Sequence, residues 1–289
     1  MTRTRRATGI GRLFVLVCVL VFVLALPPSA AAWGLAAHRW VATRAAEIVR
    51  DRCPALVAGP RATLGDAAVE PDTVLKRRDG RRELARHYMN LDHYGPPPFR
   101  ALPRDRDAAL ARYGQKTIER QGVLPWSGAL LAARLRDEIR RGDLDTARIS
   151  AGHLAHYVAD ATMPLHTTVN YDGKGTGQRG IHRRVEATLV DRDLGEYTRR
   201  SWKVATRRPI PPAGAAGALF AALEDAHGKL ATMFAADRNA SRGTKVGSAV
   251  YYRRLHADLL DPMAEQLGKA AVLTAALWEG ACAEAGDRR

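Results

Sequence analysis

One stretch of this sequence carries a histidine and a carboxylate at a spacing that suits metal binding. His156 and Asp160 stand four residues apart, so on a helix both side chains leave the same face and can reach a shared ion. Pro164 ends that helix, because proline has no backbone N–H to donate. His166 follows two residues later, where non-helical backbone can turn its imidazole back toward the same cavity. All three side chains are of the types that bind zinc.

A second pair repeats the spacing after a glycine-rich loop at 172–180. His182 and Glu186 also stand four residues apart, and five ligands are more than one tetrahedral zinc uses. A single histidine and acid at this spacing is common on solvated helices, where it forms only a weak ion pair. Two pairs joined by a Pro-Leu-His turn are much rarer by chance. The first pair is flanked by apolar residues, so we expect these polar groups to be buried and to need strong partners. The pattern therefore predicts a metal cluster.

The elements that must position these ligands are helices. Apolar residues recur at three- and four-residue spacing along the chain, and we find no convincing alternation of β-branched residues. Proline and glycine clusters separate the helices without dividing the chain into halves with separate cores. We expect one all-α domain, a helical bundle, over residues 33–289. The expected helices lie near 37–52, 105–120, 126–141, 144–162, 183–194, 215–236 and 248–282.

The first 32 residues have the pattern of a secretory signal. Four arginines precede an uninterrupted apolar run from Leu13 to Leu26, and a small-residue exit ends at Ala32. The run has about 14 residues, against the roughly 20 that a helix needs to span a bilayer, which disfavours the rival interpretation of an uncleaved anchor. We expect cleavage after Ala32 and a secreted or periplasmic protein.

Charge and cysteine content add weaker expectations. Removing the leader takes away four of the 45 basic residues and none of the 30 acids, so the net charge falls from +15 to +11. A polyanionic partner fits this charge, although many arginines stand beside acids on solvated helix faces. Cys53 and Cys282 stay in the mature chain, and they form either one disulfide or two free thiols.

Taken together, the motifs resemble the superfamily of bacterial zinc-dependent phospholipases C and the single-strand-specific zinc nucleases of fungi and plants. The matching motifs are Trp33-Gly34 with His38, His87-Tyr88, His156-x3-Asp160-x3-Pro164-Leu165-His166 and Gly180-Ile181-His182-x3-Glu186. The resemblance implies a helical bundle with three zinc ions in a cleft. It also implies that Trp33 is the first mature residue, so that its free α-amine and its carbonyl oxygen chelate one zinc.

The resemblance also implies how the ligands are divided. It gives one zinc Trp33, His38 and Asp160; a second zinc Asp72, His87, His156 and the same Asp160; and a third zinc His166, His182 and Glu186. Asp72 has two rivals, Asp66 and Asp79, which flank it. We choose Asp72 for its separation of 15 residues from His87, which resembles the family spacing, and for the preceding Pro71. The phospholipase resemblance suggests that Asp72 also orients or deprotonates the attacking water.

Three functions fit this ligand set. We expect a phosphodiester hydrolase, and a phospholipase C-type enzyme acting on phospholipid first, because Glu186 and the interval between His166 and His182 are similar to the phospholipases. A single-strand-specific nuclease or 3′-nucleotidase is the alternative, since the step from Trp33 to His38 is similar to the nucleases. Nucleases also need aromatic platforms for bases, and Tyr171 alone stands beside the glycine-rich loop. A non-catalytic zinc-binding periplasmic protein is the third.

These functions imply their partners. The substrate would be a phospholipid or nucleic-acid phosphodiester, and the basic surface would allow peripheral contact with an anionic membrane. We expect a monomer, and the sequence indicates no protein partner.

Overall fold

The fold is built from helices alone over the part of the chain that the structure, a computed structural model, describes: residues 33–286. This confirms the all-α prediction for these residues, which belong to one compact unit. The leader and its cleavage site after Ala32 lie outside the described residues. The α-helices are α2 (Leu35–Ile48), α3 (Pro54–Val57), α4 (Arg61–Ala67), α5 (Lys76–Asp79), α6 (Arg81–Leu84), α7 (Arg106–Tyr113), α8 (Gln115–Gln121), α9 (Leu124–Arg140), α10 (Leu144–Ala161), α11 (Ile181–Arg183), α12 (Val190–Ser201), α13 (Ala215–His227), α14 (Leu230–Ser241) and α15 (Ala249–Ala285).

Shorter 3-10 and π segments interrupt this series. The 3-10 turns are η2 (Ala85–His87), η3 (Leu91–Tyr94), η4 (Pro164–Thr167), η5 (Lys174–Thr176) and η7 (Pro212–Gly214), and the π segments are η1 (Pro71–Leu75) and η6 (Arg184–Leu189). Such segments change the direction in which a side chain leaves the helix, and π segments are frequent at functional sites.

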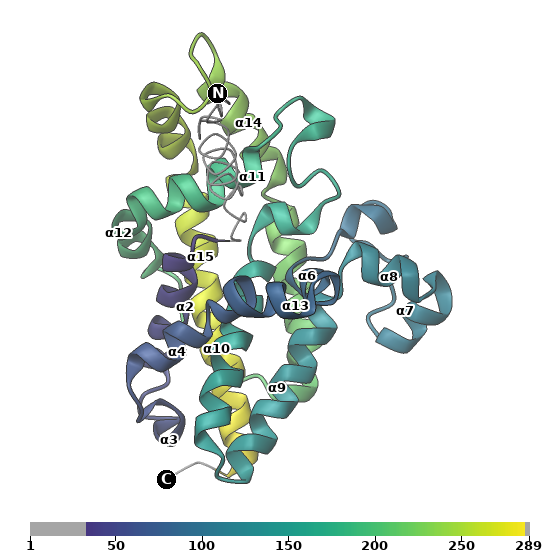
Figure 1. Cartoon of the computed structure of the whole chain (residues 1–289), viewed down its shortest axis with the longest axis vertical. Helices are drawn as coiled ribbons and strands as arrows, with labels where there is room; N and C mark the ends of the chain where they lie inside the picture. Colours follow the sequence, from purple (N-terminus) through teal and green to yellow (C-terminus); the bar gives the residue numbers. More distant parts are fainter. Residues whose placement is uncertain (1–32, 287–289) are drawn as a thin grey trace, which may run out of the picture. The chain divides into compact units, whose positions relative to one another are not determined.

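The long helix α15 is the axis of the bundle (Figure 1). It packs against α2, α9, α10, α12 and α14. Ser248 caps its first turn by accepting a hydrogen bond from the backbone N–H of Tyr251, and Gly286 ends it in the left-handed conformation. Because α15 is 37 residues long, its side chains enter two buried clusters.

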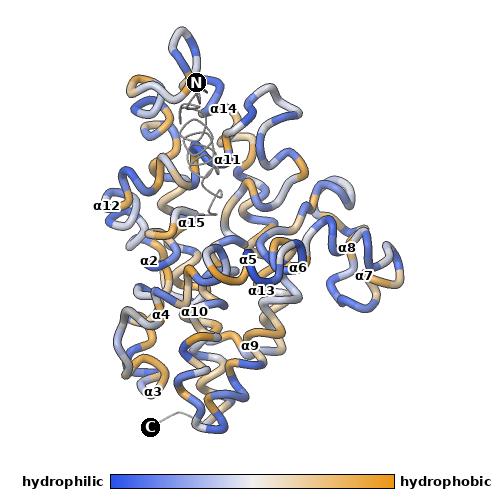
Figure 2. The backbone as a smooth tube through the Cα atoms, viewed as in Figure 1, coloured by the Kyte–Doolittle hydropathy of each residue, from blue (hydrophilic) through white to orange (hydrophobic). Residues whose placement is uncertain are grey.

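Two apolar clusters form the core. One holds side chains of α9, α10, α13 and the second half of α15, including Trp278. The other joins α2, η6, α12 and α14 to the first half of α15, including Leu255. Hydrophobic and hydrophilic residues alternate along α9 and α10 (Figure 2), as expected for helices with one buried face. The last turn of α10 reaches both clusters, through Ala161 in the first and Ala159 in the second.

The expected helices occur, with three corrections. The segment expected near 183–194 is divided among α11, the π segment η6 and α12. The segment expected near 105–120 is two helices, α7 and α8, because Gly114 adopts a φ of 75° between them. The segment expected near 215–236 is also two helices, α13 and α14, separated at Gly228 and Lys229. Short helices between 54 and 87 carry too little periodicity to be predicted. The helix expected near 144–162 is α10, which Asp143 caps and which ends before Pro164.

A disulfide joins Cys53, after α2, to Cys282 on α15. Both cysteines are buried, and the bond links residues near the two ends of the described chain. Of the two alternatives that the sequence left open, the structure has the disulfide. Among the helices of residues 33–286, none has the length and apolar character needed to cross a membrane.

Candidate metal centre

Seven different elements deliver the side chains that the sequence singled out. α10 carries His156 and Asp160 on one buried face, as their spacing predicts. The others come from α2 (His38), η1 (Asp72), η2 (His87), η4 (His166), α11 (His182) and η6 (Glu186). The structure brings all eight together in three overlapping groups that could hold metal ions.

The first group combines η1, η2 and α10. Nδ1 of His87 lies 3.0 Å from Nε2 of His156 and 2.8 Å from Oδ2 of Asp160, and Nε2 of His156 lies 3.2 Å from the same oxygen. Oδ1 of Asp72 lies 3.7 Å from His87 Nδ1 and 3.8 Å from His156 Nε2. Two ligands bound at about 2.1 Å to a tetrahedral zinc lie about 3.4 Å apart. The four atoms therefore have separations that suit one ion.

Asp160 enters a second group through its other oxygen. Oδ1 lies 3.7 Å from Nε2 of His38 and 3.4 Å from Nδ1 of His166. The His38 ring stacks on His156, with centroids 3.9 Å apart, and these two histidines with Asp160 offer ligand atoms within 4.8 Å of one another. The carboxylate of Asp160 thus lies between groups, as a bridging ligand must.

The third group lies beside η6. Nε2 of His166 lies 3.2 Å from Nε2 of His182 and 3.0 Å from Oε1 of Glu186. Nε2 of His182 lies 3.0 Å from Oε2 of Glu186. His182 is the most exposed side chain of the three groups, at 16%, so solvent reaches the centre from this side. The exposed ring of Tyr171 lies edge-on to His182, with centroids 5.5 Å apart.

Trp33 is held between these groups by its own backbone and ring. The backbone N–H of Gly34 donates to the carbonyl oxygen of Glu186 at 3.2 Å, and the Trp33 indole N–H donates to the carbonyl oxygen of Ala159 at 2.8 Å. A Cβ atom at Gly34 would lie within 2.1 Å of the Asp191 carboxylate, so that exposed side chain would have to move. The residue expected to become the N-terminus is therefore fixed next to the ligands Asp160 and Glu186.

The nitrogen and oxygen atoms that could bind a metal face one another, and several of them have no hydrogen-bond partner. Within residues 33–286, Oδ2 of Asp72, Oδ1 of Asp160 and both oxygens of Glu186 are buried and make no hydrogen bond. Buried carboxylates without hydrogen bonds cost several kcal/mol unless a cation compensates them. Nitrogen and oxygen lone pairs that converge in this way fit cations, so the residues present suit the metal ions that the resemblance implies.

Burial and neighbouring charges shift the pKa values of the groups in the centre, in several cases in opposite directions. Burial alone would raise the pKa of Asp160, but His156 and His166 outweigh it and hold that pKa well below its usual value. Burial would lower the pKa of His166, but Glu186 and Asp160 raise it to about 9. Burial and the neighbouring His156 lower the pKa of His38 to about 3. The carboxylates are therefore ionised at neutral pH.

The structure also ranks the three candidate aspartates. Asp72 is buried in the first group, whereas Asp66 is 62% exposed and pairs with Arg39. Asp79 pairs with Arg78 at 2.8 Å. Neither rival lies among the ligand groups. The choice of Asp72 by its distance from His87 therefore agrees with its position.

Lys76 is a functional candidate that the sequence reasoning missed. Its ammonium group donates to Oδ1 of Asp72, four residues earlier. Its positive charge also partly offsets the rise in the pKa values of the buried His156 and His166. The four-residue spacing between Asp72 and Lys76 was a signal for this contact. The neighbouring Arg77 and Arg78 have the same charge, so the sequence alone did not single out Lys76.

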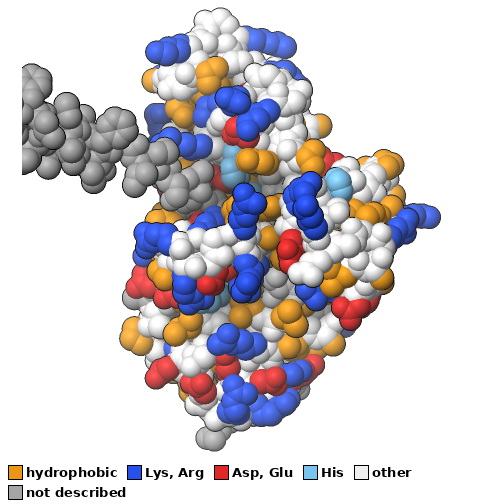
Figure 3. Space-filling model, turned by 45° about the vertical axis from the view of Figure 1, so that its right-hand side comes forward, with side chains coloured by type: hydrophobic (Ala, Val, Ile, Leu, Met, Phe, Trp, Pro, Cys, Tyr) orange, Lys and Arg blue, Asp and Glu red, His pale blue; other side chains and the backbone are white. Residues whose placement is uncertain are grey.

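Figure 3 shows the surroundings of a histidine on one face of the molecule, with an acidic side chain and several lysines and arginines nearby. A positive rim of this kind favours anionic ligands. A scan against models of known protein families finds no match to this chain, and a search of curated proteins finds none either. The functional argument therefore depends on the residues of the centre themselves.

Proposed function

We propose that this chain is a secreted zinc-dependent phosphoesterase whose three ions occupy one cleft of the helical bundle. The observation that carries the proposal is the division of Asp160 between two ligand groups, Oδ2 toward His87 and His156, and Oδ1 toward His38. A carboxylate shared in this way is typical of centres that hold metal ions a few ångströms apart, as two-metal phosphoesterases do.

The proposed ligands are those of the three groups, with Trp33 added after cleavage. Trp33, His38 and Asp160 would hold one zinc; Asp72, His87, His156 and Asp160 a second; and His166, His182 and Glu186 a third. When bound, the ions supply Lewis-acid stabilisation of phosphoryl oxygens and lower the pKa of water. Imidazole and carboxylate ligands would also admit other divalent transition metals.

Two side chains of the centre act on the substrate directly. Asp72 is ionised, because His156 and Lys76 lower its pKa against the effect of burial. Its carboxylate can accept a proton from the attacking water or orient that water toward phosphorus. Lys76 offers an ammonium group beside it, which would bind a phosphoryl oxygen and stabilise the charge that develops in the transition state.

A phospholipid is the substrate that we propose first, with the protein held at an anionic membrane surface. One exposed segment supports this contact. No acid occurs between Tyr197 and Leu223, whereas five cations do: Arg199, Arg200, Lys203, Arg207 and Arg208. Trp202 within it is 55% exposed. Tryptophan beside cations suits the interface of an anionic bilayer.

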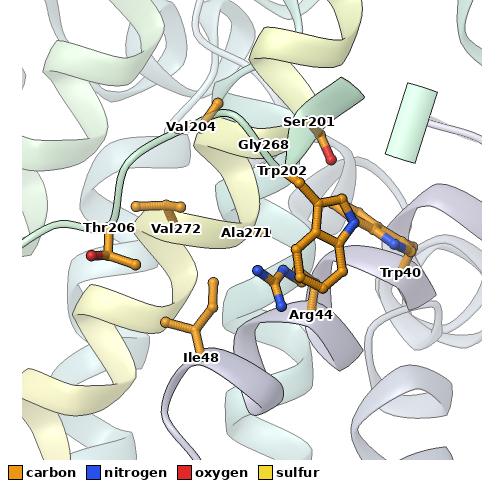
Figure 4. A pocket seen from close by; sticks show the side chains of 10 residues that line it. All are labelled: Trp40, Arg44, Ile48, Ser201, Trp202, Val204, Thr206, Gly268, Ala271 and Val272. Carbon is orange, nitrogen blue, oxygen red and sulfur yellow. The ribbon is translucent and has the colours of Figure 1, made fainter. Parts of the chain in front are cut away.

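Figure 4 shows the surroundings of Trp202, a small pocket between α2, the segment after α12 and α15. The guanidinium of Arg44 lies over the Trp202 ring, 3.3 Å from its centroid, and Trp40 lines the same pocket. Arg44 also pairs with Glu47 at 3.2 Å, so its contribution here is to hold the indole in place.

Single-stranded nucleic acid is the second candidate, and a specific observation favours it. Tyr171 is 48% exposed and lies against His182 of the third ligand group. An aromatic ring at that position would stack on a base whose phosphate binds at the centre. The ammonium group of Lys76 would bind a phosphate oxygen of either substrate.

The decisive experiment uses the mature chain that begins at Trp33. Its zinc content is counted, and hydrolysis of phosphatidylcholine and of single-stranded DNA is measured side by side, with and without a chelator. Chelator-sensitive release of diacylglycerol supports the phospholipase, and chelator-sensitive release of nucleotides supports the nuclease. Bound zinc with neither activity identifies the non-catalytic zinc protein, and an absence of bound metal refutes the proposal.

A further inference from the structure

Glu83 is a buried carboxylate outside the ligand set. It lies on α6, four residues before His87, and is fully buried. The hydroxyl of Tyr157 donates to its Oε1, and Nη1 of Arg86 donates to its Oε2 at 3.1 Å. Oε1 also lies 3.4 Å from Nε2 of His87. The carboxylate therefore contacts a proposed ligand from the side away from the centre.

The two nitrogens of His87 face different partners. Nδ1 points to His156 and Asp160 in the first ligand group, whereas Nε2 makes no hydrogen bond other than this long contact with Glu83. A neutral imidazole carries one proton and can bind a metal only through the other nitrogen. When Nδ1 binds a metal, the single proton must lie on Nε2, where the Glu83 carboxylate can accept it.

His156 offers a comparison within the same group. Its Nε2 faces the centre, and its Nδ1 lies 2.8 Å from the carbonyl oxygen of Ala68. That backbone oxygen can only accept, so it requires the proton on Nδ1. Both histidines of the group thus have an acceptor behind the nitrogen that faces away from the centre, but only His87 has a charged one. Outer carboxylates of this kind raise the basicity of a histidine ligand.

We propose that Glu83 is a positioning residue that accepts the Nε2 proton of metal-bound His87 and fixes the orientation of its ring, with Tyr157 and Arg86 holding the Glu83 carboxylate in place. The inference rests on the proposed function, because without a metal the Asp160 carboxylate competes for the His87 proton at Nδ1. Glu83 therefore acts through His87 and not on the substrate.

The first test reads the position of the His87 proton in the zinc-loaded protein. After labelling with ¹⁵N-histidine, His87 is expected to carry its proton on Nε2 at pH 8, as read from its imidazole nitrogen shifts. The His87→Ala spectrum assigns the signal. An Nδ1–H tautomer in the zinc-loaded wild-type protein would overturn the inference.

The second test measures zinc affinity by titration against a chelator of known affinity. Glu83→Ala is expected to weaken one binding step by roughly 10- to 100-fold, and this step is the one that His87→Ala abolishes. Glu83→Gln keeps an oxygen acceptor but loses the charge, so an intermediate loss is expected. If Glu83→Ala does not fold, Glu83→Gln and the tautomer measurement still decide the outcome.

Glu138 provides the matched control. It is also a buried glutamate, 1% exposed, that pairs with an arginine on its own helix, Arg134, at 2.5 Å, and it belongs to none of the ligand groups. Glu138→Gln should leave every zinc step within twofold of wild type. Equal losses in Glu83→Gln and Glu138→Gln, or no loss in Glu83→Ala, would show that Glu83 has a merely structural role. A wild-type protein that binds no zinc refutes the proposed function, whereas zinc binding that Glu83→Ala leaves unchanged refutes this inference alone.

Discussion

Gly34 donates its backbone N–H to the carbonyl oxygen of Glu186, 3.2 Å away. This bond joins the residue next to the expected N-terminus to the π segment that supplies a carboxylate of the third ligand group. The indole of Trp33 is fixed on the opposite side, at Ala159, one residue before Asp160. Both contacts hold Trp33 beside the ligand groups. Under the proposed function, cleavage would free its amine there, so maturation of the chain and assembly of the metal centre would be one event.

A mature chain with one alanine added before Trp33 should lose one zinc per molecule, because its amine would lie one residue too far from His38. The metal content of the purified protein measures this. Trp33→Phe keeps the free amine and removes only the indole bond to Ala159, so it should retain more zinc than the extended chain. Full zinc content in the extended chain would contradict an amine ligand.

Asp160→Asn should affect two ions, because the two oxygens of Asp160 face different ligand groups. We expect the zinc content to fall from three to about one per molecule and phosphoesterase activity to be lost. Asp66→Asn, which changes an exposed aspartate paired with Arg39, serves as the control and should keep full zinc content. Loss of a single zinc in Asp160→Asn would show that the carboxylate does not bridge.

Lys76→Gln should lower kcat/KM for the phosphodiester substrate by roughly 100-fold, in the range observed when one charged donor to a transition state is removed. The zinc content should stay unchanged, because an ammonium group is not a ligand. Lys76→Arg should restore part of the activity. Lys174→Gln in the exposed turn η5 is the matched control. A Lys76→Gln protein with wild-type activity would exclude a role in phosphate binding.

The metal-free protein should be most stable near pH 6.5. The folded-state pKa of His166, about 9, is above its ordinary value of 6.5. Its contribution to the free energy of unfolding is therefore complete below pH 6.5 and is lost as the pH rises through 9, a change of up to about 3 kcal/mol. The pKa of His38, about 3, is below its ordinary value, so its neutral form favours folding above pH 6.5 and stability falls as the pH drops toward 3.

Zinc should reverse the high-pH trend, because ligands must be deprotonated to bind a metal. The difference in Tm between the zinc-loaded and chelator-treated proteins should therefore widen from pH 6.5 to 9, as thermal unfolding at several pH values can show. His166→Gln should remove the decline of the metal-free protein above pH 6.5. A Tm difference that is constant with pH would contradict this assignment.

Trp202→Ala should weaken binding to vesicles of anionic phospholipid by roughly tenfold, since the loss of a buried aromatic contact costs about 1 to 2 kcal/mol. Binding should also fall as the salt concentration rises, because the neighbouring cations act through screened charges. Sedimentation with vesicles of phosphatidylserine measures both effects, and Trp40→Phe in the same pocket is the control. Equal binding to neutral and anionic vesicles would contradict a role of the basic segment in membrane binding.

Five of the candidate ligands could be predicted from local spacing (His156, Asp160, His166, His182 and Glu186), whereas Trp33, His38, Asp72 and His87 were implied by the family resemblance. His156 and Asp160 needed only the four-residue period of a helix, and the structure has both on one buried face of α10. Pro164 predicted the end of that helix for a covalent reason, its missing N–H. The signals were weaker for Asp72, which had to be chosen among three aspartates by its distance from His87.

Only the tertiary structure decided which distant atoms meet. The division of the Asp160 oxygens between groups depends on the directions in which the 3-10 turns η2 and η4 project His87 and His166, and such segments have no periodicity to detect. Lys76 and Glu83 each stand four residues from their partners, so the sequence contained that spacing but not the burial around it. The bond between Gly34 and Glu186 joins residues 152 positions apart, through backbone atoms that every residue has. The sequence by itself thus determined the kinds of ligand and the helices that carry them. Their distances and outer partners were decided by packing around α15, because contacts between distant segments are set by the shapes of all the buried side chains at once.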